Sequence, residues 1–292
     1  MSFWDVISKQ ISITTGVDFV YAEQHAVGGG CINNTQKLQS QDGRQYFVKI
    51  NNAGLLSMFE AEAEGLQELA DSNTLKVPQV VCTGIAESQS YIVMENLQLA
   101  GKGSMETFAQ QLAQMHRYTK KQFGWQRDNT IGSTPQQNNW TNNWLSFWRE
   151  HRLGYQLQLA KQNGATKQLL NNGARLMQDF DRLFSGYQPS ASLLHGDLWS
   201  GNYAFTQTGE AVIFDPAVYY GDREADMAMT ELFGGFGSRF YAAYEEAWPL
   251  DAGYKTRKTF YNLYHILNHF NMFGGGYSAQ ADRMIDRLLS EL

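Results

Sequence analysis

The sequence has few cysteines, no long apolar run and no block of like charges. Only Cys31 and Cys82 are present, without a CxxC pair, which argues against a disulfide framework or thiolate zinc site and favours a reducing, cytoplasmic location. No stretch approaches the roughly 18 consecutive apolar residues of a membrane span, and the N-terminus lacks the apolar core of a signal peptide, so no membrane partner is expected. The formal net charge of -6 gives no reason to expect a nucleic-acid partner.

The order of the expected elements predicts an α+β fold with two lobes. Residues 3–13 are expected to form a short helix, 17–50 a series of strands and 55–72 a long helix, before two more strands end near residue 96. The stripe of the long helix comprises Leu55, Phe59, Leu66 and Leu69. Later segments are helical, at 104–120, 140–162, 166–184, 223–232, 237–247, 255–272 and 278–290, with one strand-like segment at 211–215. We therefore expect a β-rich nucleotide-binding lobe, 1–96, a helical lobe, 97–292, and a ligand cleft between them.

Two segments of the helical part contain the residue types that phosphoryl transfer from ATP requires: LLHGDLWSGNYAF, 193–205, and IFDPAVYYGDREADMAM, 213–229. Asp197 is expected to accept the proton of the attacking hydroxyl, and Asn202 and Asp215 to bind Mg²⁺. HGD by itself is also explained by a turn in which Asp197 caps a helix and Asn202 forms an Asx turn. The joint spacing, with a further Asp after a buried strand, favours the functional interpretation.

The same hypothesis requires a lysine on a strand and a glutamate on the next helix. YFVKI places Lys49 on a strand, and the helix offers Glu60, Glu62 and Glu64. Glu62 is the expected partner because Leu66 and Leu69, four and seven residues further on, mark the face turned towards the sheet. The pair would hold the α- and β-phosphates of the nucleotide.

Two further segments are expected to contact the nucleotide, although GxGxxG and GxxxxGKS/T motifs are both missing. AVGGGCINN, 26–34, stands between two expected strands, where Gly28, Gly29 and Gly30 would cover the phosphates; a plain hairpin turn explains them equally well. VMENL, 93–97, is expected to contact adenine. Met94 would lie behind the ring, and the Glu95 carbonyl and Leu97 amide would form hydrogen bonds with it.

Together these segments resemble the fructosamine kinase (ketosamine 3-kinase) family, within the protein-kinase-like and aminoglycoside-phosphotransferase-like superfamily. The resemblance runs nearly the whole chain and rests on GGGCIN, FVK, MFEAEAEGL, VMENL, HGDLWSGN, IFDPAVYYGDREADMAM and LYHILNHFNMFGGGY. HGD alone occurs in many small-molecule kinases, whereas HGDLWSGN combined with DPAVYYGDREADMAM is specific to this family. In contrast to protein kinases, the chain has HGD for HRD, DPA for DFG and no APE segment.

The resemblance implies a two-lobed protein-kinase-like fold that uses ATP and Mg²⁺ to phosphorylate the 3-hydroxyl of ketosamines, the Amadori products of sugars and amines. It implies that Trp199 stacks on the sugar and that His269 lines the acceptor pocket. Pure packing of Trp199 and a satisfied buried His269 are the alternatives. By the same resemblance, Asp226 and His195 would hold the catalytic loop.

Other interpretations stay open from the sequence. The acceptor could instead be an aminoglycoside, choline or another small alcohol, although Trp199 beside the catalytic aspartate suits a sugar. A non-catalytic nucleotide-binding protein is a further alternative. We expect a monomer or weak dimer. Cys31, which follows three glycines, is either a redox-sensitive thiol that could link two copies of the chain or a small residue tolerated by its loop. His265 and His269 form HxxxH, but Ile266 stands where a zinc protease needs glutamate.

Overall fold

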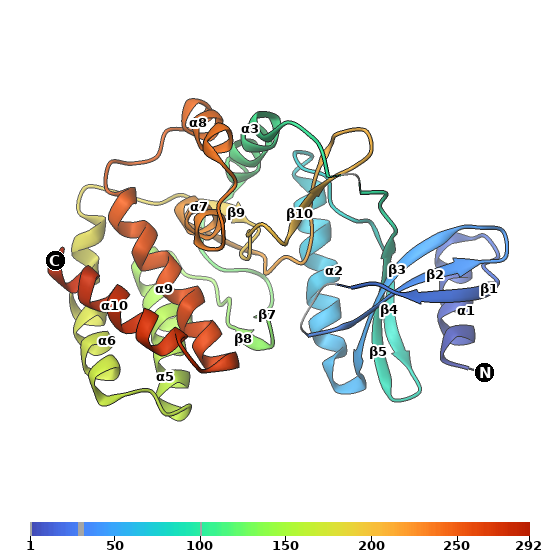
Figure 1. Ribbon diagram of the computed structural model, residues 1–292, viewed down its shortest axis with the longest axis horizontal. Coiled ribbons are helices and arrows are strands. Elements are labelled where there is room, and N and C mark those ends of the chain that lie inside the picture. The colour runs from blue at the N-terminus through green and yellow to red at the C-terminus, as the bar shows by residue number, and fades with distance from the viewer. Residues whose placement is uncertain (1, 29–31, 100) are drawn as a thin grey trace. The chain divides into compact units, whose positions relative to one another are not determined.

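The computed structural model describes residues 2–28, 32–99 and 101–292. The chain forms two compact units (Figure 1), one comprising Met1–Gly103 and Ala204–Asp215 and the other Ser104–Tyr203 and Pro216–Leu292. The segment 204–215, expected in the helical lobe, therefore belongs to the first unit, after which the chain returns to the second.

The first unit is built on a five-stranded antiparallel sheet with the strand order β1-β2-β3-β5-β4. The strands are β1 (Tyr21–Ala26), β2 (Asn34–Ser40), β3 (Gln45–Asn52), β4 (Val80–Ala86) and β5 (Gln89–Glu95). The register places Lys49 of β3 between Thr35 of β2 and Ile92 of β5. Because side chains alternate along a strand, Lys49 faces the opposite side of the sheet from Val48 and Ile50.

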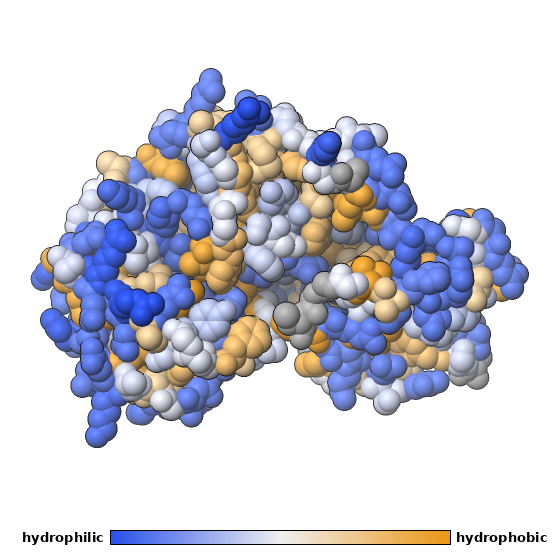
Figure 2. All heavy atoms as spheres, in the orientation of Figure 1, coloured by the Kyte–Doolittle hydropathy of each residue, from blue (hydrophilic) through white to orange (hydrophobic). Residues whose placement is uncertain are grey.

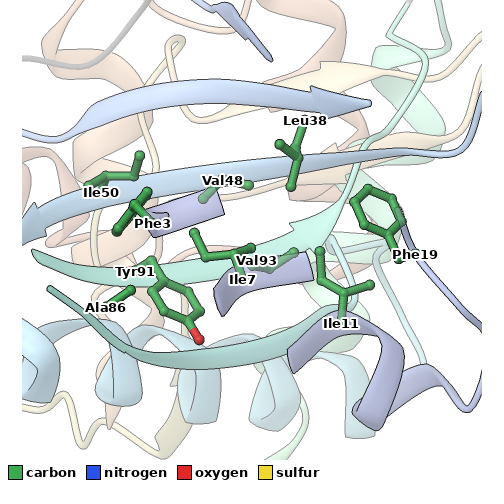
Figure 3. Packing of buried hydrophobic residues seen from close by; sticks show 10 residues of the cluster. All are labelled: Phe3, Ile7, Ile11, Phe19, Leu38, Val48, Ile50, Ala86, Tyr91 and Val93. Carbon is green, nitrogen blue, oxygen red and sulfur yellow. The ribbon is translucent and has the colours of Figure 1, made fainter. Parts of the chain in front are cut away.

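Helix α1 (Phe3–Thr15) supplies the apolar core on one side of this sheet. It begins with a capping box between Ser2 and Asp5 and ends at Gly16, which has the left-handed backbone of a helix C-cap. Figure 3 shows Phe3, Ile7 and Ile11 of α1 gathered with apolar side chains of the strands, among them Val48, Ile50 and Val93. The helix expected at 3–13 thus extends two residues further.

Helix α2 (Leu56–Asp71) packs against β4 and β5. Phe59, Leu66 and Leu69 are buried on its inner face, as the sequence predicted. The prediction for Leu55 was wrong, because this residue lies in the preceding 3-10 turn η1 (Ala53–Leu55) and is 41% exposed.

The second unit is mainly helical. Its helical segments are α3 (Met105–His116), α4 (Trp144–Trp148), the π-helix η2 (Arg149–Leu153), α5 (Gly154–Gln162), α6 (Lys167–Asp179), the 3-10 helix η3 (Phe180–Phe184), α7 (Arg223–Leu232), α8 (Ser238–Ala247), α9 (Tyr254–Phe273) and α10 (Tyr277–Ser290). The expectation of a single strand-like segment beyond residue 97 was wrong. Short strands also form, too brief to leave a periodic pattern in the sequence.

The short strands beyond residue 97 include those that directly precede and follow the predicted catalytic loop. They are β6 (Thr119–Lys120), β7 (Asn129–Ile131), β8 (Thr134–Gln136), β9 (Ala191–Leu194), β10 (Tyr203–Phe205), β11 (Ala211–Ile213) and β12 (Tyr219–Gly221). Strand β9 pairs with β6 and β12, and β10 pairs with β11. Residues 195–202 therefore connect the ends of two strands, β9 and β10.

Hydrophilic residues cover much of the visible face of each unit, and hydrophobic residues are scattered among them (Figure 2). None of the helices in residues 2–28, 32–99 and 101–292 is both long and apolar enough to cross a bilayer.

Candidate active site

Lys49 lies buried in the first unit between two carboxylates. Its Nζ donates a hydrogen bond to Oε1 of Glu62 on α2, at 2.5 Å, and another to Oδ1 of Asp215, which follows β11. Strand alternation explains the contact with α2, since Val48 and Ile50 point into the α1 core and Lys49 points away from it. The lysine and glutamate selected from the sequence are therefore in contact.

The charges of this group are unbalanced, because two carboxylates share one ammonium. Burial alone would lower the pKa of Lys49, but the carboxylates of Glu62 and Asp215 outweigh it and the pKa is raised. Burial raises the pKa of Glu62, against the effect of Lys49, and Asp215 raises it further. Lys49 thus remains a cation, and the excess negative charge favours a second cation nearby.

The residues expected to contact adenine lie at the end of β5. Met94 is buried, Glu95 is the last strand residue, and Leu97 follows. The backbone N–H of Glu95 donates to the Gln79 carbonyl at 2.8 Å. The backbone N–H of Leu97 makes no hydrogen bond within the described part of the chain, so it is available to donate to a ligand.

The glycine-rich connection between β1 and β2 is described only in part. Gly28 is exposed, and a Cβ there would meet no atom within 4 Å. Gly29, Gly30 and Cys31 lie outside the described residues, so the hypotheses about them stay as stated. Burial raises the pKa of Cys82 to about 12, which disfavours its reactive thiolate form.

The predicted catalytic loop belongs to the second unit, where it follows β9 and leads into β10, and it brings Asp197 and Asn202 together. Nδ2 of Asn202 donates to the backbone oxygen of Asp197 at 2.9 Å and to Oδ2 of its carboxylate at 3.2 Å. The backbone N–H of Asp197 donates to Nδ1 of His195 at 3.2 Å. No helix begins at Asp197, which removes the helix-capping alternative. The loop is a turn that holds the carboxylate through Asn202.

Asp226 of α7 holds the backbone of this loop. Its Oδ2 accepts the N–H of His195 at 2.7 Å, and its Oδ1 accepts the N–H of Gly196 at 2.9 Å. Burial would raise the pKa of Asp226, but the hydrogen bond from His116 and the other nearby donors outweigh it and the pKa is lowered. The carboxylate therefore stays ionised and anchors the turn.

Two further buried residues, His116 and Tyr244, extend the hydrogen bonding of Asp226 and were not predicted from the sequence. Nε2 of His116 lies 3.3 Å from Oδ2 of Asp226, and Nδ1 lies 2.7 Å from the Tyr244 hydroxyl. Burial lowers the pKa of His116, so the ring is neutral and carries its proton on Nε2, towards the carboxylate. Neither His116 nor Tyr244 belongs to a motif, and the sequence contains no signal that could have identified them.

Gly196 is required by the turn. Its φ is +82°, and a Cβ at this position would lie 2.0 Å from the backbone oxygen of Ala217. We expect Gly196→Ala to displace the loop, to lower kcat at least about tenfold and to lower the free energy of unfolding by about 1–3 kcal/mol. Steady-state kinetics and urea unfolding would measure both effects. Gly186→Ala is the matched control, because Gly186 has φ +78° but open space around its Cβ; equal losses in kcat would contradict the role of the clash.

Trp199 and His269 both contact Phe233, which sequence analysis missed. The ring centroids of Trp199 and Phe233 are 6.1 Å apart, and those of Phe233 and His269 are 5.0 Å apart. Trp199 and His269 are partly exposed, so neither is a fully buried core residue. The two residues that the resemblance assigned to the acceptor therefore lie in one group of rings.

A sequence model of the fructosamine kinase family matches residues 3–291, almost the whole chain. The chain belongs to the fructosamine kinase family. It is 49% identical, over 98% of this chain and 97% of the relative, to a protein of Synechocystis sp. named probable ketoamine kinase. It is 44% identical to the chloroplastic protein-ribulosamine 3-kinase of Arabidopsis thaliana, over 91% of this chain and 82% of that protein.

The fold agrees with the family assignment. The crystal structure of a fructosamine-3-kinase candidate from Haemophilus somnus superposes with a TM-score of 0.89 at 31% identity, covering 98% of this chain and 97% of the other. The resemblance stated from the motifs is confirmed, and so is the kinase-like α+β fold, with an antiparallel sheet in one unit and helices in the other.

Two side chains of this fructosamine kinase family member suit Mg²⁺. Asn202 uses its amide nitrogen for Asp197, which leaves Oδ1 for a metal. Asp215 uses Oδ1 for Lys49, and its side chain is 45% exposed, which leaves Oδ2. No group of three His, Cys, Asp or Glu in the described segments is arranged to hold a metal ion by itself. Each of these two oxygens is of the type that Mg²⁺ binds, and Mg²⁺ in nucleotide sites takes further ligands from phosphates and water.

Burial of His265, the first histidine of HxxxH on α9, should make the stability of the protein depend on pH. Burial lowers its pKa from the ordinary value of 6.5 to about 3, and His269 contributes to the shift. Between these values the unfolded chain binds a proton that the folded chain does not, so stability falls as pH falls. We expect this group to cost about 1.4 kcal/mol per pH unit below pH 6. Urea unfolding at several pH values from about 6 to 4 would show that the free energy of unfolding falls less steeply with pH for His265→Gln. An equally steep fall would contradict the assignment.

Proposed function

We propose that this protein is an ATP- and Mg²⁺-dependent kinase that phosphorylates the 3-hydroxyl of ketosamines. Family membership over residues 3–291 supports the reaction class. The identities of 49% and 44% to proteins named ketoamine kinase and ribulosamine 3-kinase support the acceptor. The observation that carries the proposal is the carboxylate of Asp197, held in HGDLWSGN by Asn202 and by a backbone fixed on Asp226.

In this proposal Asp197 orients the attacking hydroxyl and accepts its proton. The hydroxyl oxygen forms the new bond to the γ-phosphorus, the bond from that phosphorus to the β,γ-bridging oxygen breaks, and ADP leaves. Lys49, held by Glu62, donates hydrogen bonds to phosphate oxygens and stabilises their charge. Mg²⁺, when bound through Asn202 and Asp215, would neutralise further phosphate charge.

The remaining predicted contacts complete the proposed nucleotide site. Met94, the Glu95 carbonyl and the Leu97 amide would hold adenine, and the backbone of Gly28, Gly29 and Gly30 would cover the phosphates. Trp199 would stack on the sugar beside Asp197, with His269 lining the same pocket. We also propose a reducing compartment, the cytoplasm, because only two cysteines occur in the chain. The proposed oligomeric state is a monomer or weak dimer.

The product has a chemical consequence. Enolisation of the 3-phosphate towards C1 makes the phosphate allylic to an enaminol, which eliminates inorganic phosphate. Water then hydrolyses the resulting imine and releases the free amine and a 3-deoxydicarbonyl sugar. Phosphorylation by this enzyme would in this way remove the adduct and restore the free amine.

ADP release from MgATP with a panel of acceptors tests the proposal. The panel comprises ribuloselysine, fructoselysine, an aminoglycoside and choline. Turnover confined to the two ketosamines is the expected result. Turnover only with the aminoglycoside or choline would keep the phosphotransferase and overturn the acceptor, and MgATP binding without any turnover would favour a non-catalytic nucleotide-binding protein.

A further inference from the structure

We propose that the acceptor site continues into a subsite for the amine-bearing part of the substrate, formed by a row of aromatic rings on the second unit. This aromatic row comprises Trp199, Phe233, His269, Phe273 and Tyr277. The sugar would lie on Trp199 beside His269, and the proposed occupant of the rest of the row is the side chain of a glycated lysine, with its methylene groups and its protonated secondary amine. The inference rests on the proposed function and specifies which part of the ketosamine these rings bind.

The rings follow one another at contact distance. Centroids are 6.1 Å apart from Trp199 to Phe233 and 5.0 Å from Phe233 to His269. From His269 the row continues to Phe273, at 5.7 Å, and to Tyr277, at 5.1 Å. Phe273 is 56% exposed, and the other four are partly exposed. The row thus runs over the surface from the catalytic loop to the end of α9 and the start of α10, two helices that pack together in this unit (Figure 1).

The row is continuous with the catalytic loop. Trp199 stands two residues after Asp197, and Oγ of the next residue, Ser200, donates to the backbone oxygen of Phe233 at 3.1 Å. The loop that holds the proposed base is therefore tied directly to the second ring. A substrate with its 3-hydroxyl at Asp197 has its C1 amine only two carbons away, and the lysine chain continues from that amine along the row.

The glycines that follow Phe233 and Phe273 leave space beside these two rings of the row. Phe233 is followed by two glycines, 234–235, and Phe273 by three, 274–276; the residues 234, 235, 274 and 275 have φ between +62° and +98°. A Cβ at 234, 274 or 275 would meet no atom within 4 Å. These glycines therefore serve the left-handed turns rather than close packing, and they leave the space beside the two phenylalanines unfilled.

The chemistry of the row suits a lysine side chain. Aromatic faces bind methylene groups through apolar contact and attract an ammonium through their quadrupole. Burial lowers the pKa of His269, although its hydrogen bond to the His265 carbonyl opposes this, so the ring is neutral and does not repel a cation. A small adduct such as that of methylamine would reach fewer of these rings than a lysine adduct.

The test compares two substrates with the same sugar, the ribulosamine of Nα-acetyl-lysine and the ribulosamine of methylamine. A change that affects only the lysine adduct then belongs to this subsite and not to the sugar site. For Phe273→Ala we expect the ratio of kcat/KM, lysine adduct over methylamine adduct, to fall about tenfold, mainly through KM of the lysine adduct. Tyr277→Leu should lower the ratio in the same direction, and Phe273→Leu should lower it less because apolar contact remains. Tyr118→Ala, which truncates another exposed aromatic side chain of this unit, is the control.

The outcomes distinguish the inference from the function on which it rests. If the wild-type protein phosphorylates both adducts but Phe273→Ala and Tyr277→Leu leave the ratio as in Tyr118→Ala, the subsite is overturned and the proposed function stands. If the variants lose kcat/KM equally on both adducts, the rings belong to the sugar site or to the fold and the inference fails. If the wild-type protein phosphorylates neither adduct, both proposals fail.

Discussion

Asp197→Asn is expected to lower kcat by a factor on the order of 10³, with little change in KM for ATP. The substitution preserves the shape of the side chain but removes its capacity to accept the proton of the attacking hydroxyl, a contribution typically worth about 10²–10⁴. The turn should persist, because the backbone oxygen of residue 197 still accepts from Asn202 and Asp226 still holds the two preceding N–H groups. Steady-state kinetics with a ketosamine and MgATP would measure the loss.

A surface aspartate of the same unit provides the control for this experiment. Asp179→Asn removes one carboxylate whose only described ion pair is a 3.7 Å contact with exposed Arg182, so kcat should stay within about twofold of the wild-type value. A thermal-unfolding midpoint shared by both variants and the wild-type protein would show that the loss is chemical. An Asp197→Asn variant with more than about a tenth of wild-type kcat would contradict the role of Asp197 as the base.

Lys49→Met is expected to lower kcat/KM for ATP by about 10²–10³, because the phosphates lose a buried cationic donor. It should also destabilise the first unit. Removing one partner of a buried ion pair typically costs about 3–5 kcal/mol, and Glu62 can recover part of this cost by taking up a proton, since its pKa is already raised. Nucleotide titration and urea unfolding would measure the two effects separately.

The double variant Lys49→Met with Glu62→Gln separates binding from stability. Glu62→Gln removes the carboxylate that the single variant leaves without its ammonium, so the double variant should recover much of the stability and none of the activity. A double variant as unstable as Lys49→Met would show that the charge of Glu62 is not the cause. A Lys49→Met variant with wild-type affinity for ATP would contradict the assignment of Lys49 to the phosphates.

The sequence predicted the residues whose spacing is local and whose chemistry is specific. Asp197 and Asn202 stand five residues apart in one loop, and the structure joins them by direct hydrogen bonds. Lys49 and Glu62 stand 13 residues apart on a strand and the following helix, where the apolar pattern indicates which glutamate faces the sheet. The phosphoryl-transfer hypothesis required a lysine on a strand, which selected Lys49, and helix periodicity then selected Glu62 among three glutamates.

Contacts between distant segments could not be predicted in this way. His116 reaches Asp226 across 110 residues, and nothing in the sequence near either residue specifies the other. Phe233 lies just after the last residue of α7, at Leu232, and resembles an ordinary core phenylalanine until the structure places it against Trp199 and His269. The strands beyond residue 97 are two to four residues long, so tertiary pairing rather than local pattern determines them.

The central claim is the transfer of phosphate from ATP to the 3-hydroxyl of a ketosamine. Phosphorus NMR of a reaction with ribuloselysine and MgATP tests it most directly. The account predicts a new phosphate monoester on C3, formed together with ADP. This ester then decays to inorganic phosphate as free lysine appears. It should not be detected when Asp197→Asn reacts for the same time. An ester at another carbon, or ADP formed with inorganic phosphate and no ester, would contradict it.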